Sequence, residues 1–289
     1  MSWANFLRYR RTLRQLIRQY EIDTVVCDPI CSTPRMVLML QTCPGIRRVV
    51  SAPPLKRRHA LLSFGLEAVN QEKSFHSPLT AQCDDLLAFL GADCQARVEI
   101  YPSPTEVKRA HDFIESIPDK FQTIALIPFS RQQATGWPLE NVREFIALKP
   151  EDINLIVLGE RQDLAKIRPF AEGARHVYFA AGLTFREAFC VIRHTQLMVS
   201  VDTGPAQLFG ALSIPILKLN SYRIPNQKWG FHGDPRYYDI EVPAACGPCY
   251  QSACPFQDHP CMSGIAAKDV WAKIETISLP GAARKICAN

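Results

Sequence analysis

Mainly apolar runs alternate with stretches of helical spacing through the second half of the chain. The runs predict strands at residues 123–127, 154–158, 177–179, 197–201 and 215–219. Helices are predicted between and after them, at residues 139–148, 163–170, 184–194 and 205–212. Thr184 is expected to be the N-cap of the third helix, with Glu187 completing a capping box. This alternation predicts a parallel sheet covered on both faces, which places the chain in the α/β class.

The first half of the chain shows a weaker version of the pattern. It predicts helices at 5–20, 35–41, 84–90 and 106–116, strands at 24–27 and 48–50, and a linker at 101–104. Gly91 is expected to end the third of these helices. We therefore expect a partial N-terminal domain over residues 1–104 and a C-terminal domain over residues 105–289. Residues 228–261 are rich in Pro and Gly and are expected to form a loop before a last helix at 267–277.

The composition, with 47% hydrophobic and 21% charged residues, is typical of a folded, soluble protein. No apolar run approaches the roughly 18 residues of a membrane span, and the N-terminus lacks the apolar segment of a signal peptide. A cytoplasmic protein is therefore expected. The net charge of +5 comes largely from early basic residues, which solvated helix faces explain better than a nucleic-acid surface. No zinc-finger, RRM or helix-turn-helix signature accompanies them, so no nucleic-acid partner is expected.

The segment Asp202-Thr-Gly-Pro follows a predicted strand and opens a predicted helix. In open α/β sheets, this carboxyl edge is where ligands bind. Gly204 suits a tight turn and Pro205 suits the first helical position. Unpaired amides, the Thr203 hydroxyl and the helix dipole together favour a phosphate or diphosphate. The alternative is an ordinary N-cap at Asp202 or Thr203, without a ligand.

Three further blocks give this turn its context. They are Ile127-Pro-Phe-Ser130 with Gly136-Trp-Pro-Leu-Glu-Asn-Val-Arg-Glu-Phe145, then Val157-Leu-Gly159, then Ala181-Gly-Leu-Thr-Phe-Arg-Glu187. Together with Asp-Thr-Gly-Pro-Ala and the following Ala-Leu-x-Ile-Pro, their order and spacing resemble glycosyltransferase family 9, the ADP-heptose:lipopolysaccharide heptosyltransferases. The resemblance covers roughly residues 120–275 well and the first hundred residues loosely.

The resemblance implies a GT-B architecture, in which two Rossmann-like domains with parallel sheets face each other across a cleft. It also implies inverting, metal-independent transfer of a sugar, with heptose as the expected sugar, from a nucleotide-diphosphate donor to a lipopolysaccharide or other glycan or lipid-linked acceptor. No cofactor is required for such a transfer. The positions expected to bind the donor are Ser130, Arg131, Thr135, Gly159, Glu160, Asp202, Thr203, Gly204 and Gln207.

The chain departs from the family pattern at three places. The family's early glycine-rich turn with its base-like Asp has no match, so no catalytic residue is assigned; Asp23 and Asp28 are candidates without geometric support. The position that is commonly Lys is Thr135, and the position that is usually His is Gln207. These changes favour a second hypothesis, a degenerate binding module without turnover. They also leave open a partner or second copy that completes the N-terminal domain, and a peripheral contact at the inner face of the membrane.

Four cysteines cluster near the C-terminus with the spacing C-x2-C-x4-C-x6-C, at Cys246, Cys249, Cys254 and Cys261. Four thiolates at such spacing are able to surround a tetrahedral structural zinc or iron ion, with His259 as a spare ligand. The alternatives are reduced or disulfide-paired cysteines that stabilise a long loop, and redox activity. A similar block in many members of the resembled family supports a structural role, at the rim of the donor pocket.

Overall fold

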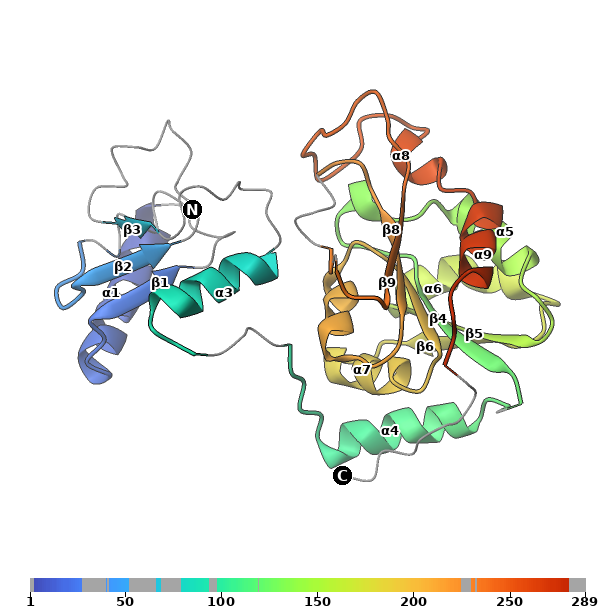
Figure 1. Cartoon of the computed structure of the whole chain (residues 1–289), viewed down its shortest axis with the longest axis horizontal. Coiled ribbons are helices and arrows are strands. Elements are labelled where there is room, and N and C mark those ends of the chain that lie inside the picture. Colours follow the sequence, from blue (N-terminus) through green and yellow to red (C-terminus); the bar gives the residue numbers. More distant parts are fainter. Residues whose placement is uncertain are drawn as a thin grey trace. The chain divides into compact units, whose positions relative to one another are not determined.

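The computed structural model of the chain describes residues 3–27, 40, 42–51, 66–68, 79–93, 98–118, 120–224, 230–231 and 233–280 (Figure 1). The chain forms two compact units, Met1–Ala96 and Arg97–Asn289. The division lies before the boundary expected at 104/105. The reason is that Ser103 caps helix α4 (Pro104–Glu115), which packs within the second unit.

The second unit is built on a six-stranded sheet in which every neighbouring pair is parallel. Its strands are β4 (Gln122–Ile127), β5 (Ile153–Gly159), β6 (Val177–Ala181), β7 (Leu197–Val201), β8 (Ile216–Asn220) and β9 (Tyr237–Glu241). The order β6-β5-β4-β7-β8-β9 runs outward from β4 in one direction and from β7 in the other. This is the order of a doubly wound sheet, with a switch point between β4 and β7.

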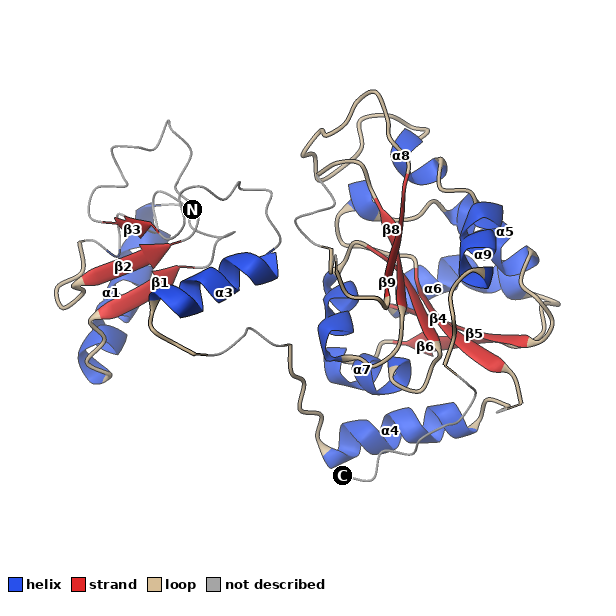
Figure 2. Ribbon diagram, in the orientation of Figure 1, coloured by secondary structure: helices blue, strands red, loops and turns tan. Residues whose placement is uncertain are grey.

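Helices cover both faces of this sheet (Figure 2). On one face, α5 (Leu139–Ala147), α6 (Arg161–Ile167) and α9 (Ala267–Glu275) pack on residues such as Leu155 and Val157. On the other face, α4, α7 (Phe185–Ile192) and η4 (Gly204–Ala211) pack on residues such as Ile156 and Leu158. Alternate residues of one strand thus enter two cores, which explains its nearly continuous apolar sequence and confirms the predicted covered parallel sheet.

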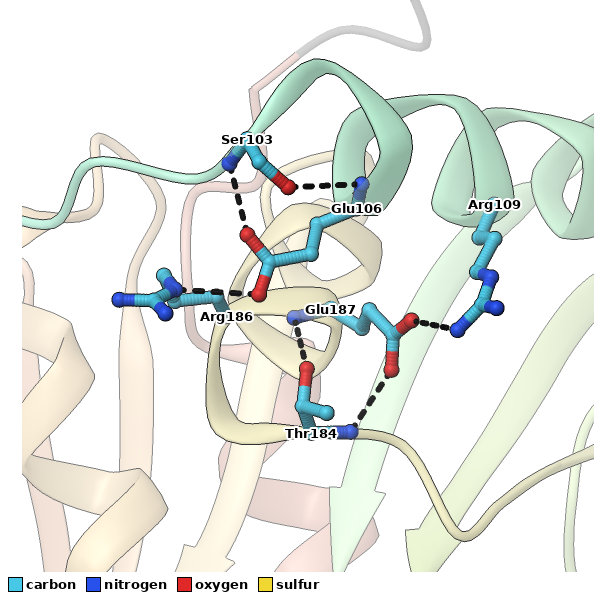
Figure 3. Close-up of polar contacts among 6 residues, drawn as sticks. All are labelled: Ser103, Glu106, Arg109, Thr184, Arg186 and Glu187. Atoms are coloured by element: carbon cyan, nitrogen blue, oxygen red, sulfur yellow. Dashed lines mark hydrogen bonds and ion pairs between the residues drawn. The ribbon is translucent and has the colours of Figure 1, made fainter.

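Helices α4 and α7 each begin with a capping box, and the glutamates of the two boxes also join the helices to each other (Figure 3). Thr184 and Glu187 form the box at the start of α7, as predicted from their spacing, and Ser103 and Glu106 form a second box, not predicted from the sequence, at the start of α4. Each glutamate also binds an arginine of the opposite helix, Arg186 for the first and Arg109 for the second. Helix α4, near the start of the second unit, is therefore joined to α7 by ion pairs as well as by apolar contact.

The first unit contains a three-stranded parallel sheet, β1-β2-β3, formed by Thr24–Cys27, Arg48–Ser51 and Leu66–Ala68. Helices α1 (Trp3–Gln19) and α3 (Leu79–Phe89) accompany it. Gly91 follows α3 with φ of 77°, as expected of a helix-ending glycine. Strand β3 was not expected from the sequence, and most of the helix predicted at 35–41 lies outside the described residues.

One sequence-based expectation about the second unit is wrong. Strand β9 lies within the segment expected to be loop, because an edge strand whose five residues are all half-buried lacks a strong apolar pattern. The helix predicted after β7 is confirmed at Gly204–Ala211, and it is of the 3₁₀ type. Short elements complete the unit, namely η2 (Gln133–Thr135), η3 (Arg168–Ala171) and α8 (Pro260–Ser263). Over the part of the chain described, no helix is both long and apolar enough to cross a membrane.

Candidate functional site

The switch point of the six-stranded sheet brings two of the predicted donor-binding segments together. Strands β4 and β7 are hydrogen-bonded neighbours, with Ile127 paired to Ser200. The loop that follows β4 and the turn that follows β7 therefore leave the same edge of the sheet side by side. In doubly wound sheets, the strands on either side of the switch point diverge into helices on opposite faces, and the crevice between them is the usual ligand site.

The turn after β7 begins with Asp202, followed by half-buried Thr203 and exposed Gly204. The amide of Ala206 donates to the carbonyl of Thr203 at 3.0 Å, which starts η4. Gly204 does not occupy the left-handed region, and a Cβ added to it would meet no heavy atom within 4 Å. Gly204, which the sequence suggested as suited to a tight turn, therefore does not use a backbone conformation that only glycine adopts easily. The absence of a side chain at Gly204 leaves open space beside the turn.

A buried ion pair lies beneath this turn. Lys218 Nζ lies 2.9 Å from Asp202 Oδ1, with 2% and 16% of the two side chains exposed. Lys218 stands in the middle of β8, directly across from Ser200 on β7 and Asp239 on β9. Sequence reasoning missed this residue, although a lysine inside the apolar run at 215–219 was a usable signal, since lysine is rarely buried without a partner.

Further polar groups surround the pair on β8 and β9. Asn220 donates to Asp239 at 3.3 Å and lies across from Glu241. Burial raises the pKa of Tyr237, and Asp239 and Asp202 add to the increase. The carboxyl edge between β7 and β9 is therefore rich in acidic groups, with the ammonium of Lys218 among them.

The loop between β4 and α5 carries Ser130, Arg131 and Thr135. Ser130 Oγ accepts from the amide of Gln132 at 3.2 Å, and Arg131 is exposed. Thr135 is 2% exposed, and its hydroxyl donates to the Gln132 carbonyl at 3.0 Å. The proton of Thr135 is thus used within the loop. Its place in donor binding stays a prediction, as do those of Ser130 and Arg131.

The remaining predicted donor-binding residues differ in their surroundings. A Cβ on Gly159 would lie 3.1 Å from Phe129 and 3.3 Å from Leu164, so a larger residue would fit only if these side chains moved by a few tenths of an ångström. Glu160 is exposed at the start of α6, and Gln207 is half-buried in η4. The roles of all three in binding a donor stay predictions.

The four clustered cysteines line one pocket of about 170 Å³. His259, Arg223 and Ala134 of the β4–α5 loop also line it. Among the described residues, which include all four cysteines, no three His, Cys, Asp or Glu side chains are placed to hold a metal ion. The arrangement therefore differs from the closed four-thiolate site that the spacing predicts. Burial, with Cys246 and Cys254 nearby, raises the pKa of Cys261 and favours its neutral thiol.

The cysteine-rich loop is joined to the β4–α5 loop through Ala134. The amide of Ala134 donates to Ser252 at 3.1 Å, and its carbonyl lies 3.2 Å from His259 Nε2. Tyr250 donates to the carbonyl of Arg223, whose guanidinium in turn donates to the Gln251 carbonyl. The loop thus supports the segment that carries Ser130 and Arg131.

The two candidate bases in the first unit are Asp23 and Asp28. Asp23 precedes β1, and its side chain accepts from the hydroxyl of Thr24 at 2.9 Å. It lies at the amino end of the strand, the edge opposite to the one where such sheets bind ligands, so the structure argues against it as a base. Asp28 follows the last residue of β1 but lies outside the described residues.

Comparisons with known proteins agree on one family and one fold. The model of the family described as Glycosyltransferase family 9 (heptosyltransferase) matches residues 67–258. No curated protein matches the sequence significantly. Among solved structures, the glycosyl transferase family 9 protein of Veillonella parvula DSM 2008 is similar with a TM-score of 0.66 and 15% identity, over 96% of this chain and 79% of that one.

Two Escherichia coli structures show the same likeness. Heptosyltransferase WaaC with ADP-2-deoxy-2-fluoro heptose gives a TM-score of 0.60 at 16% identity, over 93% of this chain and 76% of that one. ADP-heptose lps heptosyltransferase II gives 0.61 at 15% identity, over 93% and 80% of the two chains. At these identities the likeness establishes the fold, which is the parallel-sheet α/β fold of GT-B glycosyltransferases.

Proposed function

Because the chain belongs to glycosyltransferase family 9, whose model matches residues 67–258, we propose that it transfers heptose from ADP-heptose to a lipopolysaccharide or related glycan acceptor. Family membership makes the chain a glycosyltransferase. The sugar, the nucleotide, the acceptor, the inversion of configuration and the independence from metal are parts of the proposal. Two similar structures of Escherichia coli WaaC, one with ADP and one with an ADP-heptose analogue, support the donor.

The observation that carries the proposal is the position of Asp202, Thr203 and Gly204. They leave β7 at the switch point, beside the loop after β4, where a doubly wound sheet binds nucleotides. Gly204 leaves open space above its backbone, so a diphosphate is able to approach the turn closely. The start of η4 adds partial positive charge, although a 3₁₀ helix of this length contributes less than a longer α-helix would.

In the proposed reaction, an acceptor hydroxyl attacks the anomeric carbon of the donor sugar. The new glycosidic bond forms as the bond to the diphosphate oxygen breaks, and ADP leaves with the electron pair. Negative charge grows on the diphosphate, so the groups around the turn after β7 and the loop with Ser130 and Arg131 act by stabilising it. A base accepts the proton of the acceptor hydroxyl, and the described residues do not assign it.

The test is transfer from ADP-heptose by the purified full chain, followed as ADP release with and without a lipopolysaccharide acceptor that lacks heptose. We expect acceptor-dependent ADP release and an acceptor heavier by one heptose, both unaffected by EDTA. Thr203→Ala should lower the rate by about tenfold or more while the unfolding curve stays unchanged. Absence of nucleotide release and of acceptor modification, with ADP-heptose and with other nucleotide-activated sugars, would reject transfer.

A second candidate is a nucleotide-binding module without turnover. Thr135 and Gln207 favour it, since both are uncharged at positions where the family commonly places Lys and His, and Thr135 is buried. This candidate predicts that ADP binds in calorimetry while no acceptor or donor combination releases product. Acceptor-dependent turnover would eliminate it.

A further inference from the structure

Lys218 is unusual because a charged side chain lies inside the sheet. It stands in a strand whose five residues are all buried, and it is itself 1% exposed. An ammonium taken out of water is costly unless an opposite charge and hydrogen bonds compensate it. Asp202 provides that compensation at 2.9 Å. The pair therefore joins the middle of β8 to the first residue of the turn where the donor is proposed to bind.

Without Lys218, the turn would lie among carboxylates whose negative charge is not compensated. Asp202 follows β7 on one side, and Asp239 and Glu241 stand on β9 on the other. All three carboxylates act on the same neighbouring group, Tyr237, whose pKa they raise. A nucleoside diphosphate carries at least two negative charges at neutral pH, and at this edge of the sheet it would meet like charges at short range.

We propose that Lys218 is a positioning residue for donor binding, which acts through Asp202 by cancelling its charge and holding its carboxylate below the turn. This inference rests on the proposed function, because it concerns how the same site receives a nucleoside diphosphate. With the carboxylate neutralised and drawn toward β8, the backbone of Thr203 and Gly204 and the Thr203 hydroxyl face a diphosphate without a competing negative charge. The lysine, being buried, exerts this effect without touching the donor.

The uncharged residues Thr135 and Gln207 lie in the loop after β4 and in η4. Lys218 does not replace a cation at those positions, because its pair with Asp202 carries no net charge. It removes the negative charge of Asp202 from inside the sheet, where water screens the interaction less than at an exposed site. The effect should therefore depend on the number of phosphate charges in the ligand.

The experiment measures the affinity of ADP, AMP and adenosine by calorimetry for the wild type and for Lys218→Met, which keeps the length of the side chain. We expect ADP binding to weaken by at least about tenfold, AMP binding by less, and adenosine binding to change little. The double variant Lys218→Met with Asp202→Asn removes both charges. It should bind ADP at least about threefold more tightly than Lys218→Met alone.

Lys149→Met is the matched control, because Lys149 is also partly buried but donates only to the carbonyls of Pro150 and Ile153. It should leave all three affinities unchanged. Equal weakening of ADP, AMP and adenosine by Lys218→Met would overturn the inference, because it would indicate general damage to the fold. Unchanged ADP binding would overturn it as well.

If Lys218→Met does not fold, the double variant replaces it, and the inference then requires the preference for ADP over adenosine to match that of Asp202→Asn alone. A preference at least tenfold below that of Asp202→Asn would overturn it. If the wild type does not bind ADP, the proposed transfer from ADP-heptose fails together with the inference. If the wild type binds ADP and the variants show no charge dependence, only the role of Lys218 fails.

Discussion

The guanidinium of Arg109 on α4 lies 2.9 Å from the carboxylate of Glu187 on α7. Glu187 uses its other oxygen to accept from the amide of Thr184 at 2.8 Å, so one carboxylate caps its own helix and binds the next. Glu106 has the same two functions, toward Ser103 of its own helix and Arg186 of α7. The two helices are therefore joined by a reciprocal pair of capping glutamates (Figure 3).

This arrangement predicts a loss of stability in acid. The hydrogen bond from the Ser103 amide, with the Arg186 guanidinium beside it, lowers the pKa of Glu106 from its usual 4.5 to about 2. The folded state thus favours the ionised form, and the resulting stability is complete above about pH 4.5 and declines as the pH falls toward 2. The pKa of Glu187 is lowered for the same reasons, first by the Thr184 amide and then by Arg109.

Urea unfolding at a series of pH values tests this prediction. Glu106→Gln should have a lower midpoint than the wild type near pH 7, and the difference should shrink as the pH falls below about 4.5. Glu140→Gln is the control, because Glu140 is 74% exposed and pairs only with Arg143 on its own helix. A Glu106→Gln curve that runs parallel to the wild-type curve at every pH would contradict the account.

Alanine substitutions at the two glycines predicted to bind the donor should affect stability to different extents. Gly159→Ala places a methyl group 3.1 Å from Phe129 and 3.3 Å from Leu164, and we expect it to lower the free energy of unfolding by about 1–2 kcal/mol. Gly204→Ala meets open space, so stability should change by no more than about 0.5 kcal/mol. If the turn binds the donor, Gly204→Ala should nevertheless weaken ADP binding. Equal stability of the two variants would refute the packing role of Gly159.

Local patterns in the sequence were sufficient for much of the second unit. Strand β7 was predicted with its observed bounds because all five of its residues are buried. The capping box at Thr184 was also predicted, since both of its members lie within one turn of a helix. Such features depend on residues that are close in the sequence, so the periodicity of apolar residues is sufficient to predict their positions.

The features that the sequence did not predict, in the fold and in the candidate site, depend on contacts between distant segments. Arg109 and Glu187 are 78 residues apart, so no spacing rule connects them. The partner of Lys218 became visible only when the register of β7 and β8 placed Asp202 beside it. The spacing of the cysteines predicted that the four thiols would lie close together, and they line one pocket. Whether they also converge on one metal ion depends on the conformation of the backbone between them, which the spacing does not determine.

Trp137 belongs to the Trp-Pro segment that helped to identify the family, and its role in the structure is packing. It is 3% exposed, stacks edge-on against Phe145, and donates from Nε1 to the Ile265 carbonyl at 3.0 Å. Asn141 donates to the same carbonyl, so Trp137→Phe leaves that oxygen with a partner.

We expect Trp137→Phe to lower the free energy of unfolding by about 1 kcal/mol and Trp137→Ala by about 3–5 kcal/mol, both measured by urea unfolding. Phe185→Leu, at a half-exposed ring, should cost far less. A cost for Trp137→Phe as large as that for Trp137→Ala would contradict this partition.

The cysteine-rich loop should show graded, not uniform, thiol reactivity. Cys246 is exposed, Cys249 and Cys254 are half-buried, and Cys261 is buried with a raised pKa. Because the thiolate is the reactive form, alkylation near pH 7.5 followed by mass spectrometry should modify Cys246 first and Cys261 last. The rate at Cys261 should keep rising at a higher pH than the rate at Cys246 does.

The same experiment with one equivalent of Zn²⁺ decides between the arrangements considered for these residues. Since no three ligating side chains converge in the described chain, we expect the order of reactivity of Cys246 and Cys261 to persist with zinc present. If one equivalent protects all four thiols together and EDTA releases them, the loop closes into the tetrahedral site that its spacing predicts. Cys246→Ser should then abolish the joint protection, whereas in the graded arrangement it removes only the fastest-reacting thiol.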